Sequence, residues 1–291
     1  MDRTLERVHV VCDSYACHSR QILRSFPGGR HGICAGQRWY CSVDCFVQAA
    51  STTLFALSNR QVVEMPRTPR LSLGLVMLSK GYLTAEQLRT ATRDNQWRDE
   101  DLDSTLIRLG MATEKQIATA RSAQWGYPVL AQEHFGRMVE TDLPRALLAS
   151  CSAAPLHYSQ AAKRILLGFV VRVEYSLLQA IEQMTGCRVD PCFITATDLA
   201  EQNERLTQIS GHKEIPVEDP GSPEKMARSL GRAAVDIEAA NVEFTRCRND
   251  IWVRLSGRRG IADVIFRMKN VLGDAFMAQS DVLVESGASL G

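Results

Sequence analysis

The sequence has 291 residues, of which 45% are hydrophobic and 23% charged, so the chain can bury hydrophobic cores, and its length favours two or three domains. A formal net charge of +1 excludes a protein whose whole surface is devoted to nucleic acid or anionic lipid. The N-terminus lacks the apolar core of a secretory signal, and no apolar run reaches the length of a membrane span. We therefore expect a cytoplasmic, reducing location, in which the nine cysteines are thiols or metal ligands rather than disulfides.

Cysteines mark the first predicted domain, residues 1–55, because five of the nine lie between positions 12 and 45. A segment this small buries too little surface to be stable alone and usually needs a metal or cross-links. Two short-spaced pairs could supply a tetrahedral, four-thiolate structural zinc site: Cys12 with Cys17, and Cys41 with Cys45. The sequence therefore predicts a small zinc module.

The segment YCSVDCFVQAA, residues 40–50, resembles the second knuckle of treble-clef zinc modules, where an aromatic-Cys-Ser turn leads into a helix that carries the last cysteine. Other candidate ligands nearby are Cys34, His18 and His31, and partly buried free thiols are the alternative interpretation. Residues 1–70 hold nine arginines against five acidic residues, so a zinc-module nucleic-acid binder is a third functional hypothesis.

After a predicted linker at residues 56–69, one pattern occurs twice, as VMLSKGYLTAEQL from position 76 and as TLIRLGMATEKQI from position 105. In each copy an apolar helical segment ends at a glycine, Gly81 or Gly110, a residue suited to the left-handed position after a helix. A threonine followed three residues later by a glutamine then forms a capping box for a second helix. We predict two helical hairpins that pack as a four-helix unit over residues 70–126.

This repeat resembles the N-terminal domain of type II secretion and type IV pilus assembly ATPases, which would span residues 70–207 here. The family includes a variant that binds cyclic di-GMP through a duplicated motif, RLGxxLxxxGxxxxxxLxxxLxxQ, whose initial arginine reaches the nucleotide. Ser72 and Asp101 stand at the two arginine positions, Asp103 replaces a glycine, and Arg121 replaces a leucine. Because an aspartate repels phosphate, we expect no cyclic di-GMP binding, and a nucleotide-responsive sensor is kept as the alternative function.

Residues 127–207 resemble the small α/β subdomain of the same family. RILLGFVV, residues 164–171, is an apolar run of strand length, and residues 175–186 have a 3.6-residue period that ends at a glycine. A short strand is predicted at residues 187–194, where Pro191 favours the edge of a sheet.

A second linker is predicted at residues 208–221, followed by a C-terminal α/β hairpin subdomain at residues 222–291. This subdomain resembles the region just ahead of the motor in the same ATPases. We expect a helix, then two strands, 241–247 and 251–256, joined by a turn at Asn249 and Asp250.

The sequence contains no GxxxxGK[ST] loop, and about 30 residues after the hairpin are too few for a nucleotide-hydrolysing domain, so we predict no enzyme activity. Seven basic residues against two acidic ones lie between positions 246 and 269. We expect Arg254, Arg258 and Arg259 to present a basic face to a protein partner, the alternative being a solvated hairpin face. The sequence thus predicts an α+β, multi-domain, non-catalytic adaptor that contacts an inner-membrane platform component or a motor ATPase.

Overall fold

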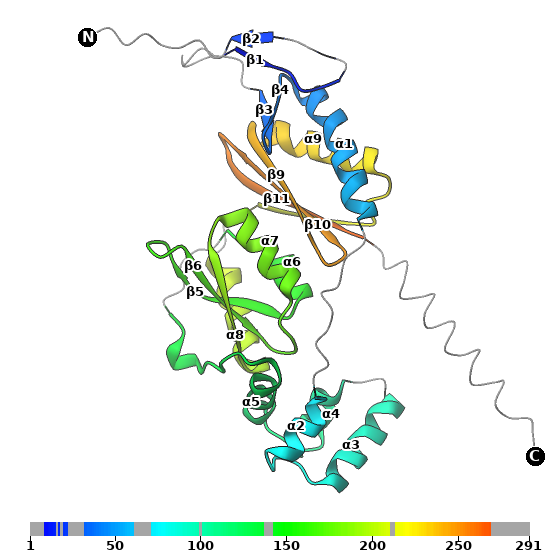
Figure 1. Ribbon diagram of the computed structural model, residues 1–291, viewed down its shortest axis with the longest axis vertical. Coiled ribbons are helices and arrows are strands. Elements are labelled where there is room, and N and C mark those ends of the chain that lie inside the picture. Colours follow the sequence, from blue (N-terminus) through cyan, green and yellow to red (C-terminus); the bar gives the residue numbers. More distant parts are fainter. Residues whose placement is uncertain are drawn as a thin grey trace, which may run out of the picture. The chain divides into compact units, whose positions relative to one another are not determined.

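The computed structural model describes residues 9–15, 17, 20–22, 32–60, 71–98, 101–136, 142–209 and 213–268. The chain is an α+β protein that divides into two compact units (Figure 1). Unit 1 combines Met1–Val62 with Lys213–Gly291, and unit 2 is Val63–His212. Within the described ranges, no helix combines the length and the apolar character that crossing a bilayer requires.

Unit 1 is built on a six-stranded sheet with the strand order β4-β3-β9-β10-β11-β8, to which both ends of the chain contribute. β3 pairs in parallel with β9, β11 pairs in parallel with β8, and the other neighbours are antiparallel. The strands are β3 (Ile33–Ala35), β4 (Arg38–Tyr40), β8 (Lys213–Glu218), β9 (Ala239–Cys247), β10 (Asp250–Gly257) and β11 (Gly260–Arg267). A separate two-stranded sheet joins β1 (His9–Val11) to β2 (Arg20–Ile22).

Two helices, α1 (Val43–Asn59) and α9 (Pro223–Asp236), lie against each other beside the sheet of unit 1 (Figure 1). They pack closely, because a Cβ added at Gly231 would lie 2.6 Å from Cγ2 of Val47. One hydrophobic core contains Phe46 of α1, Leu230 of α9 and Val253 of β10. The structure therefore differs from the predicted division into separate modules at 1–55 and 222–291, since the two segments share one sheet and one core.

Other boundaries in unit 1 also differ from the sequence prediction. The predicted linker at 208–221 contains β8, a strand at the edge of the sheet. The sequence did not indicate a strand here because the segment contains Pro216 and has charged residues at both ends. The turn between β9 and β10 is one residue earlier than predicted, at Arg248 and Asn249, and Arg248 adopts a φ of 53°. A third strand, β11, follows the predicted hairpin. At the predicted linker 56–69, α1 continues to Asn59, and residues 61–70 lie outside the described part of the chain.

The first part of unit 2 is the predicted set of two helical hairpins. Its helices are α2 (Leu73–Ser79), α3 (Ala85–Arg98), α4 (Leu102–Arg108) and α5 (Glu114–Trp125). Gly81 and Gly110 follow α2 and α4 with φ values of 69° and 62°, the left-handed conformation expected at these positions. Thr113 forms a capping box with Gln116, which confirms the predicted start of α5.

The equivalent box in the first hairpin is also present. The backbone N–H of Thr84 donates to Oε1 of Gln87 at 2.8 Å, and the N–H of Gln87 donates to Oγ1 of Thr84 at 3.2 Å. The buried side chains of both hairpins form one cluster that includes Met77, Ala91 and Leu106. The repeat is therefore a pair of capped hairpins that share a core.

The second part of unit 2 is a three-stranded sheet, β5-β6-β7, with helices packed on it. Its elements are the 3₁₀ turn η1 (Gln132–His134), α6 (Arg145–Ser150), β5 (Ala153–Ser159), β6 (Arg164–Phe169), α7 (Tyr175–Thr185), β7 (Arg188–Phe193) and α8 (Ala196–Ile209). β7, with Pro191, occupies an outer position in the strand order, as predicted. Helix α5 joins the two parts, because the carboxylate of Glu114 accepts hydrogen bonds from the backbone N–H of Thr197 at 2.9 Å and from its Oγ1 at 3.1 Å.

Candidate metal centre and duplicated helical face

Four cysteines of unit 1 converge on one point, although each comes from a different place in the N-terminal segment. Cys12 follows β1, and Cys17 closes a turn in which its N–H donates to the carbonyl oxygen of Ser14 at 3.1 Å. Cys41 follows β4, and Cys45 lies in the first turn of α1. Their Sγ atoms all lie within 4.8 Å of one another.

The spacing of the sulfur atoms fits a single metal ion. Sγ of Cys41 lies 3.5 Å from Sγ of Cys17 and 3.7 Å from Sγ of Cys45. In a tetrahedral zinc site with Zn–S bonds of about 2.3 Å, the sulfur atoms lie about 3.8 Å apart. The four thiols predicted from the sequence are thus brought together in an arrangement that suits a tetrahedral, thiolate-preferring ion.

The thiols differ in how readily they lose a proton. Burial, reinforced by hydrogen bonds with the neighbouring thiols, raises the pKa of Cys41 to about 12. Hydrogen bonding with Ser42 lowers the pKa of Cys45 to about 7. Cys45 also lies at the N-terminus of α1, where the helix dipole favours a thiolate. A bound divalent cation would remove the proton from every coordinating thiol, including that of Cys41.

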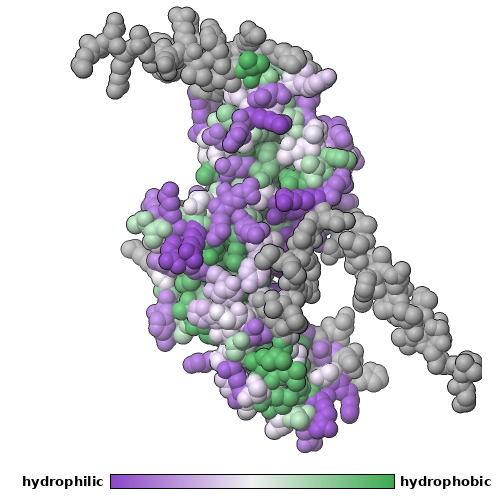
Figure 2. All heavy atoms as spheres, viewed as in Figure 1, coloured by the Kyte–Doolittle hydropathy of each residue, from purple (hydrophilic) through white to green (hydrophobic). Residues whose placement is uncertain are grey.

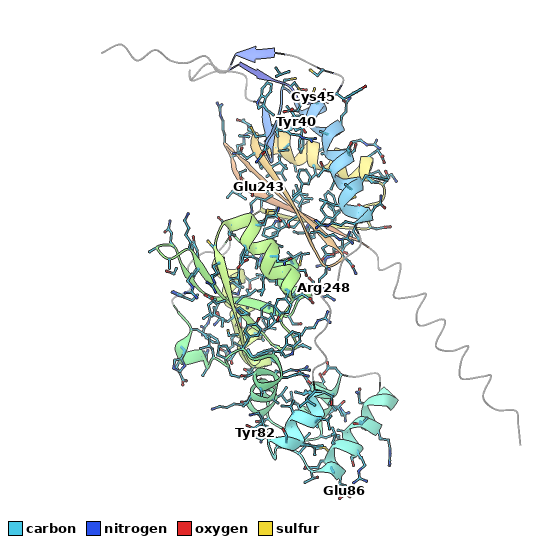
Figure 3. The ribbon with its side chains drawn as sticks, viewed as in Figure 1. Tyr40, Cys45, Tyr82, Glu86, Glu243 and Arg248 are labelled. Atoms are coloured by element: carbon cyan, nitrogen blue, oxygen red, sulfur yellow. The ribbon has the colours of Figure 1, made fainter. Side chains whose placement is uncertain are left out.

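Hydrogen bonds hold the loop of Cys12 in place beside β4. The N–H of Trp39 donates to Oδ2 of Asp13 at 2.8 Å, and the N–H of Asp13 donates to the carbonyl oxygen of Trp39 at 2.9 Å. Tyr40 and Cys45 lie at the same end of unit 1 (Figure 3). Among the alternative ligands, Cys34 lies on β3 and is not part of the cluster, while His18 and His31 lie outside the described residues.

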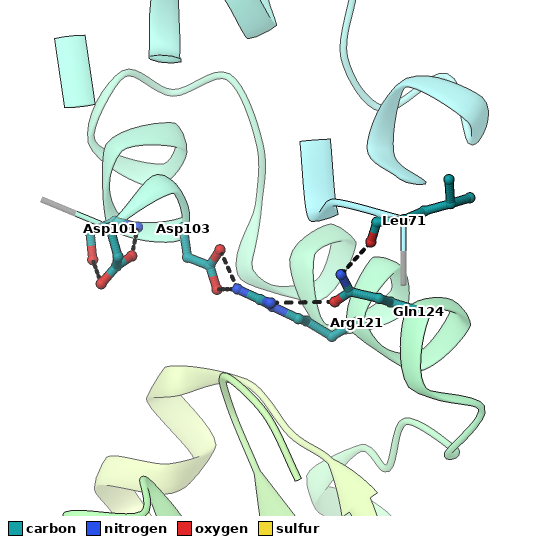
Figure 4. Close-up of polar contacts among 6 residues, drawn as sticks. Leu71, Asp101, Asp103, Arg121 and Gln124 are labelled. Carbon is teal, nitrogen blue, oxygen red and sulfur yellow. Dashed lines mark hydrogen bonds and ion pairs between the residues drawn. The ribbon is translucent and has the colours of Figure 1, made fainter. Parts of the chain in front are cut away.

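In unit 2, Ser72 and Asp101 stand at the two positions where the motif has arginine, and each caps the N-terminus of a helix. Oγ of Ser72 accepts a hydrogen bond from the backbone N–H of Leu75 at 3.4 Å, at the start of α2. Oδ1 of Asp101 accepts a hydrogen bond from the N–H of Ser104 at 2.8 Å, at the start of α4 (Figure 4). Each side chain therefore satisfies backbone donors of its own helix.

An ion pair lies beside the cap of α4 (Figure 4). Nη2 of Arg121 donates to both carboxylate oxygens of Asp103, at 2.8 and 2.9 Å, and the two side chains are 16% and 13% exposed. Burial raises the pKa of Asp103, while the guanidinium of Arg121 acts in the opposite direction. Nη1 of Arg121 also donates to Oε1 of Gln124 at 3.4 Å, and Nε2 of Gln124 donates to the carbonyl oxygen of Leu71 at 2.6 Å. The network therefore joins α4, α5 and the residue two positions before α2.

The predicted basic face is only partly present, because Arg254 is buried. Its Nε and Nη2 donate to Oδ1 and Oδ2 of Asp263 at 3.0 and 2.8 Å, and its guanidinium lies 5.0 Å from the ring centre of Trp252. The strand register places Arg254 directly opposite Asp263, and a buried charge needs such a partner. Arg254 is therefore not part of an exposed basic face.

Arg258 and Arg259 are exposed on the turn between β10 and β11. Their backbone N–H groups donate to the carbonyl oxygens of Glu238 and Ile237, at 3.4 and 3.2 Å, so the turn is held against the end of α9. The side chain of Arg259 also pairs with the carboxylate of Glu238 at 2.8 Å. These two arginines therefore lie on a turn whose backbone is fixed by hydrogen bonds to the residues that follow α9.

The sequence is 26% identical over 121 residues to the type IV pilus assembly ATPase PilB of Thermus thermophilus. This match confirms the predicted resemblance to the N-terminal domains of secretion and pilus assembly ATPases. It covers 41% of this chain and only 14% of PilB. No protein-family model matches the chain.

Two solved structures are also similar to the chain, each at 18% sequence identity. MshE with cdg has a TM-score of 0.39, and the similarity covers 47% of this chain and 99% of that one. The N-terminal domain of XpsE has a TM-score of 0.36, and the similarity covers 46% of this chain and 92% of that one.

The ion pair of Asp103 and Arg121 was not predicted from the sequence. Both residues differ from the motif of the secretion ATPase N-terminal domains. Each residue was recognised as a departure from the motif, but the two were not connected. A signal was present, since both positions changed within one motif copy and acquired opposite charges. The sequence alone did not place the first turn of α4 beside α5.

Proposed function

We propose that this protein is a non-catalytic, cytoplasmic adaptor that works with a type II secretion or type IV pilus assembly machine through protein association. The observation that carries the proposal is the PilB match, in which 121 residues of this chain correspond to a small share of a much longer motor protein. In addition, the sequence printed here contains no phosphate-binding GxxxxGK[ST] loop. The partner is an inner-membrane platform component or a motor subunit.

The turn of Arg258 and Arg259 is the proposed contact surface. The ion pair between Arg259 and Glu238 is exposed, with side chains 65% and 44% accessible, and exposed pairs of this kind contribute little to stability. A carboxylate of a partner can therefore replace Glu238 at low cost. Because the backbone of the turn is held by hydrogen bonds to the end of α9, little additional ordering accompanies binding.

We further propose that the four-thiol cluster holds a structural zinc ion. The chain should bind one zinc per molecule, measured by metal analysis of protein purified without chelator. Replacing Cys41, which contacts Cys17 and Cys45, with serine should abolish binding. Cys34→Ser is the matched control, because Cys34 lies outside the cluster and its replacement should leave the zinc content unchanged. Less than half a zinc per unmodified chain would contradict the assignment.

The side chains at the motif positions of helices α2, α4 and α5 favour an adaptor over a cyclic di-GMP sensor. Ser72 and Asp101 cap helices at the two motif arginine positions, and the carboxylate of Asp103 is paired with Arg121. We expect isothermal titration with cyclic di-GMP to give no heat of binding. Micromolar affinity would favour the sensor.

The adaptor proposal is tested by affinity capture of the full chain from its host after cross-linking, with mass spectrometry of the captured proteins. A platform component or motor ATPase should be enriched, and the double reversal Arg258→Glu with Arg259→Glu should abolish that enrichment. Arg228→Glu with Arg232→Glu is the matched control, because these arginines are exposed on α9 of the same unit and the charge change is identical. Equal loss of capture in both variants would exclude a specific role for the turn.

A further inference from the structure

The four-thiol cluster is connected to the hydrophobic core that both ends of the chain share. Cys12 is 2% exposed and belongs to the same core as Phe46, Leu230 and Ile251. Cys17, Cys41 and Cys45 are partly buried and pack against that core. The candidate metal ligands are therefore part of a domain that is completed by strands about 200 positions later in the sequence.

Helix α1 begins at the cluster and ends beside the C-terminal end of β9. At its N-terminus it carries Cys45, and at its C-terminus Nη1 of Arg246, on β9, donates to the carbonyl oxygens of Leu57 and Arg60. These interactions satisfy carbonyl groups that the helix itself leaves without donors. Cys45 and Arg248, the residue that follows β9, lie toward opposite ends of unit 1 (Figure 3). The helix thus connects the cluster to the β9–β10 hairpin.

A second connection leads from α1 to the basic turn. Gly231 of α9 allows close contact with Val47 of α1, and the end of α9 accepts the backbone hydrogen bonds of Arg258 and Arg259. Figure 2 shows the hydrophilic and hydrophobic residues on one face of the molecule. If α1 separates from the sheet, α9 loses a large part of its packing surface. The turn then loses the element that holds it.

We propose that metal occupancy of the four-thiol cluster controls the order of the described part of unit 1, including β9, β10, β11 and the turn of Arg258 and Arg259. With the metal bound, the loop of Cys12 and Cys17 is fixed to the start of α1, and α1 stays on the sheet. Without it, the C-terminal strands lose protection together with the N-terminal segment, because metal binding at such sites is coupled to folding. The consequence that metal loss ends partner capture rests on the proposed function.

Hydrogen exchange of the full chain, read by mass spectrometry, tests this coupling without any partner. The protein is compared as purified, after treatment with a metal chelator, and after re-addition of zinc alone. Chelation should increase exchange in β9 and β11 by about tenfold or more, and zinc should restore protection. Helices α2–α5 of unit 2 serve as the internal control and should not change. If the protein is purified without metal, zinc addition should raise the protection of β9 and β11.

Unchanged protection of β9 and β11 through chelation and zinc addition, or a change restricted to residues 9–60, would overturn the inference. Cys17→Ser should reproduce the effect of chelation and Cys34→Ser should not. Should Cys17→Ser fail to fold, the reversible metal experiment on the unmodified chain still decides. Failure of partner capture alone would contradict the proposed function and leave this coupling intact, because the exchange experiment contains no partner.

Discussion

Replacing Arg121 with leucine, the residue that the resembled motif has there, tests the ion pair in the duplicated helical unit. The change leaves the carboxylate of Asp103, whose side chain is 13% exposed, without the two hydrogen bonds from Nη2 of Arg121. Breaking a buried pair by removing one partner costs about 3–5 kcal/mol, and the partial exposure here favours about 3 kcal/mol. The opening equilibrium of α2–α5 should therefore shift by about a hundredfold.

The penalty should depend on pH in a defined direction. Burial raises the pKa of Asp103 above its ordinary value of 3.8, so the folded state holds this proton at higher pH than the unfolded state does. The ionised carboxylate therefore lowers stability above the folded pKa, and this loss is relieved as the pH falls toward 3.8. Because Arg121 opposes the rise in pKa, removing it should make the penalty largest at neutral pH and smaller under acidic conditions.

The assay is hydrogen exchange of the full chain in increasing urea at pH 7 and pH 5, with the free energy of opening taken from peptides of α2–α5. Asp103→Ala should cost less than Arg121→Leu, because a long arginine side chain can extend toward water. The double variant should lie within about 1 kcal/mol of the unmodified protein. The reasoning is refuted if Arg121→Leu costs less than about 0.5 kcal/mol, or if the double variant is as unstable as the two single changes added together.

Three further changes test the local and long-range contacts by the same exchange assay. Thr113→Ala removes a capping box and should destabilise α5 by about 1 kcal/mol, whereas Thr119→Ala on the same helix should change the free energy by less than about 0.5 kcal/mol. Gly231→Ala places a Cβ 2.6 Å from Cγ2 of Val47 and should lower the stability of unit 1 by about 1–3 kcal/mol. Arg246→Ala removes hydrogen bonds to the end of α1 and should expose that helix end to exchange, at a cost of about 2 kcal/mol. No change in exchange at residues 55–60 would contradict the proposed role of Arg246.

Features that depend on residues a few positions apart were predictable. The glycines after α2 and α4 and the capping box at the start of α5 are recognisable because turn and cap geometry involve only neighbouring residues. The outer position of β7 followed from the missing N–H of Pro191. The four thiols of the cluster were predictable because they occur as two short-spaced pairs in the sequence. The distances between the two pairs were not predictable.

The contacts that define unit 1 could not be predicted in this way. Nothing in the local pattern of β3 indicates that it pairs with β9. Likewise, nothing in the local pattern of residues 213–218 indicates that they form strand β8. Arg254 looked like a surface charge because other arginines lie close to it in the sequence, yet the β10–β11 register places it opposite Asp263.

By itself, then, the sequence determined the glycine turns and capping boxes of the repeated hairpins, the four thiols that lie together and the family that the repeat resembles. The tertiary structure alone decided that the N-terminal and C-terminal parts of the chain form one compact unit and that two charged residues, Asp103 and Arg254, are buried in ion pairs. The physical reason is that a cap or a turn is stabilised within a few residues. In contrast, a buried charge or a strand edge is stabilised by whatever the fold brings beside it, however distant in the chain.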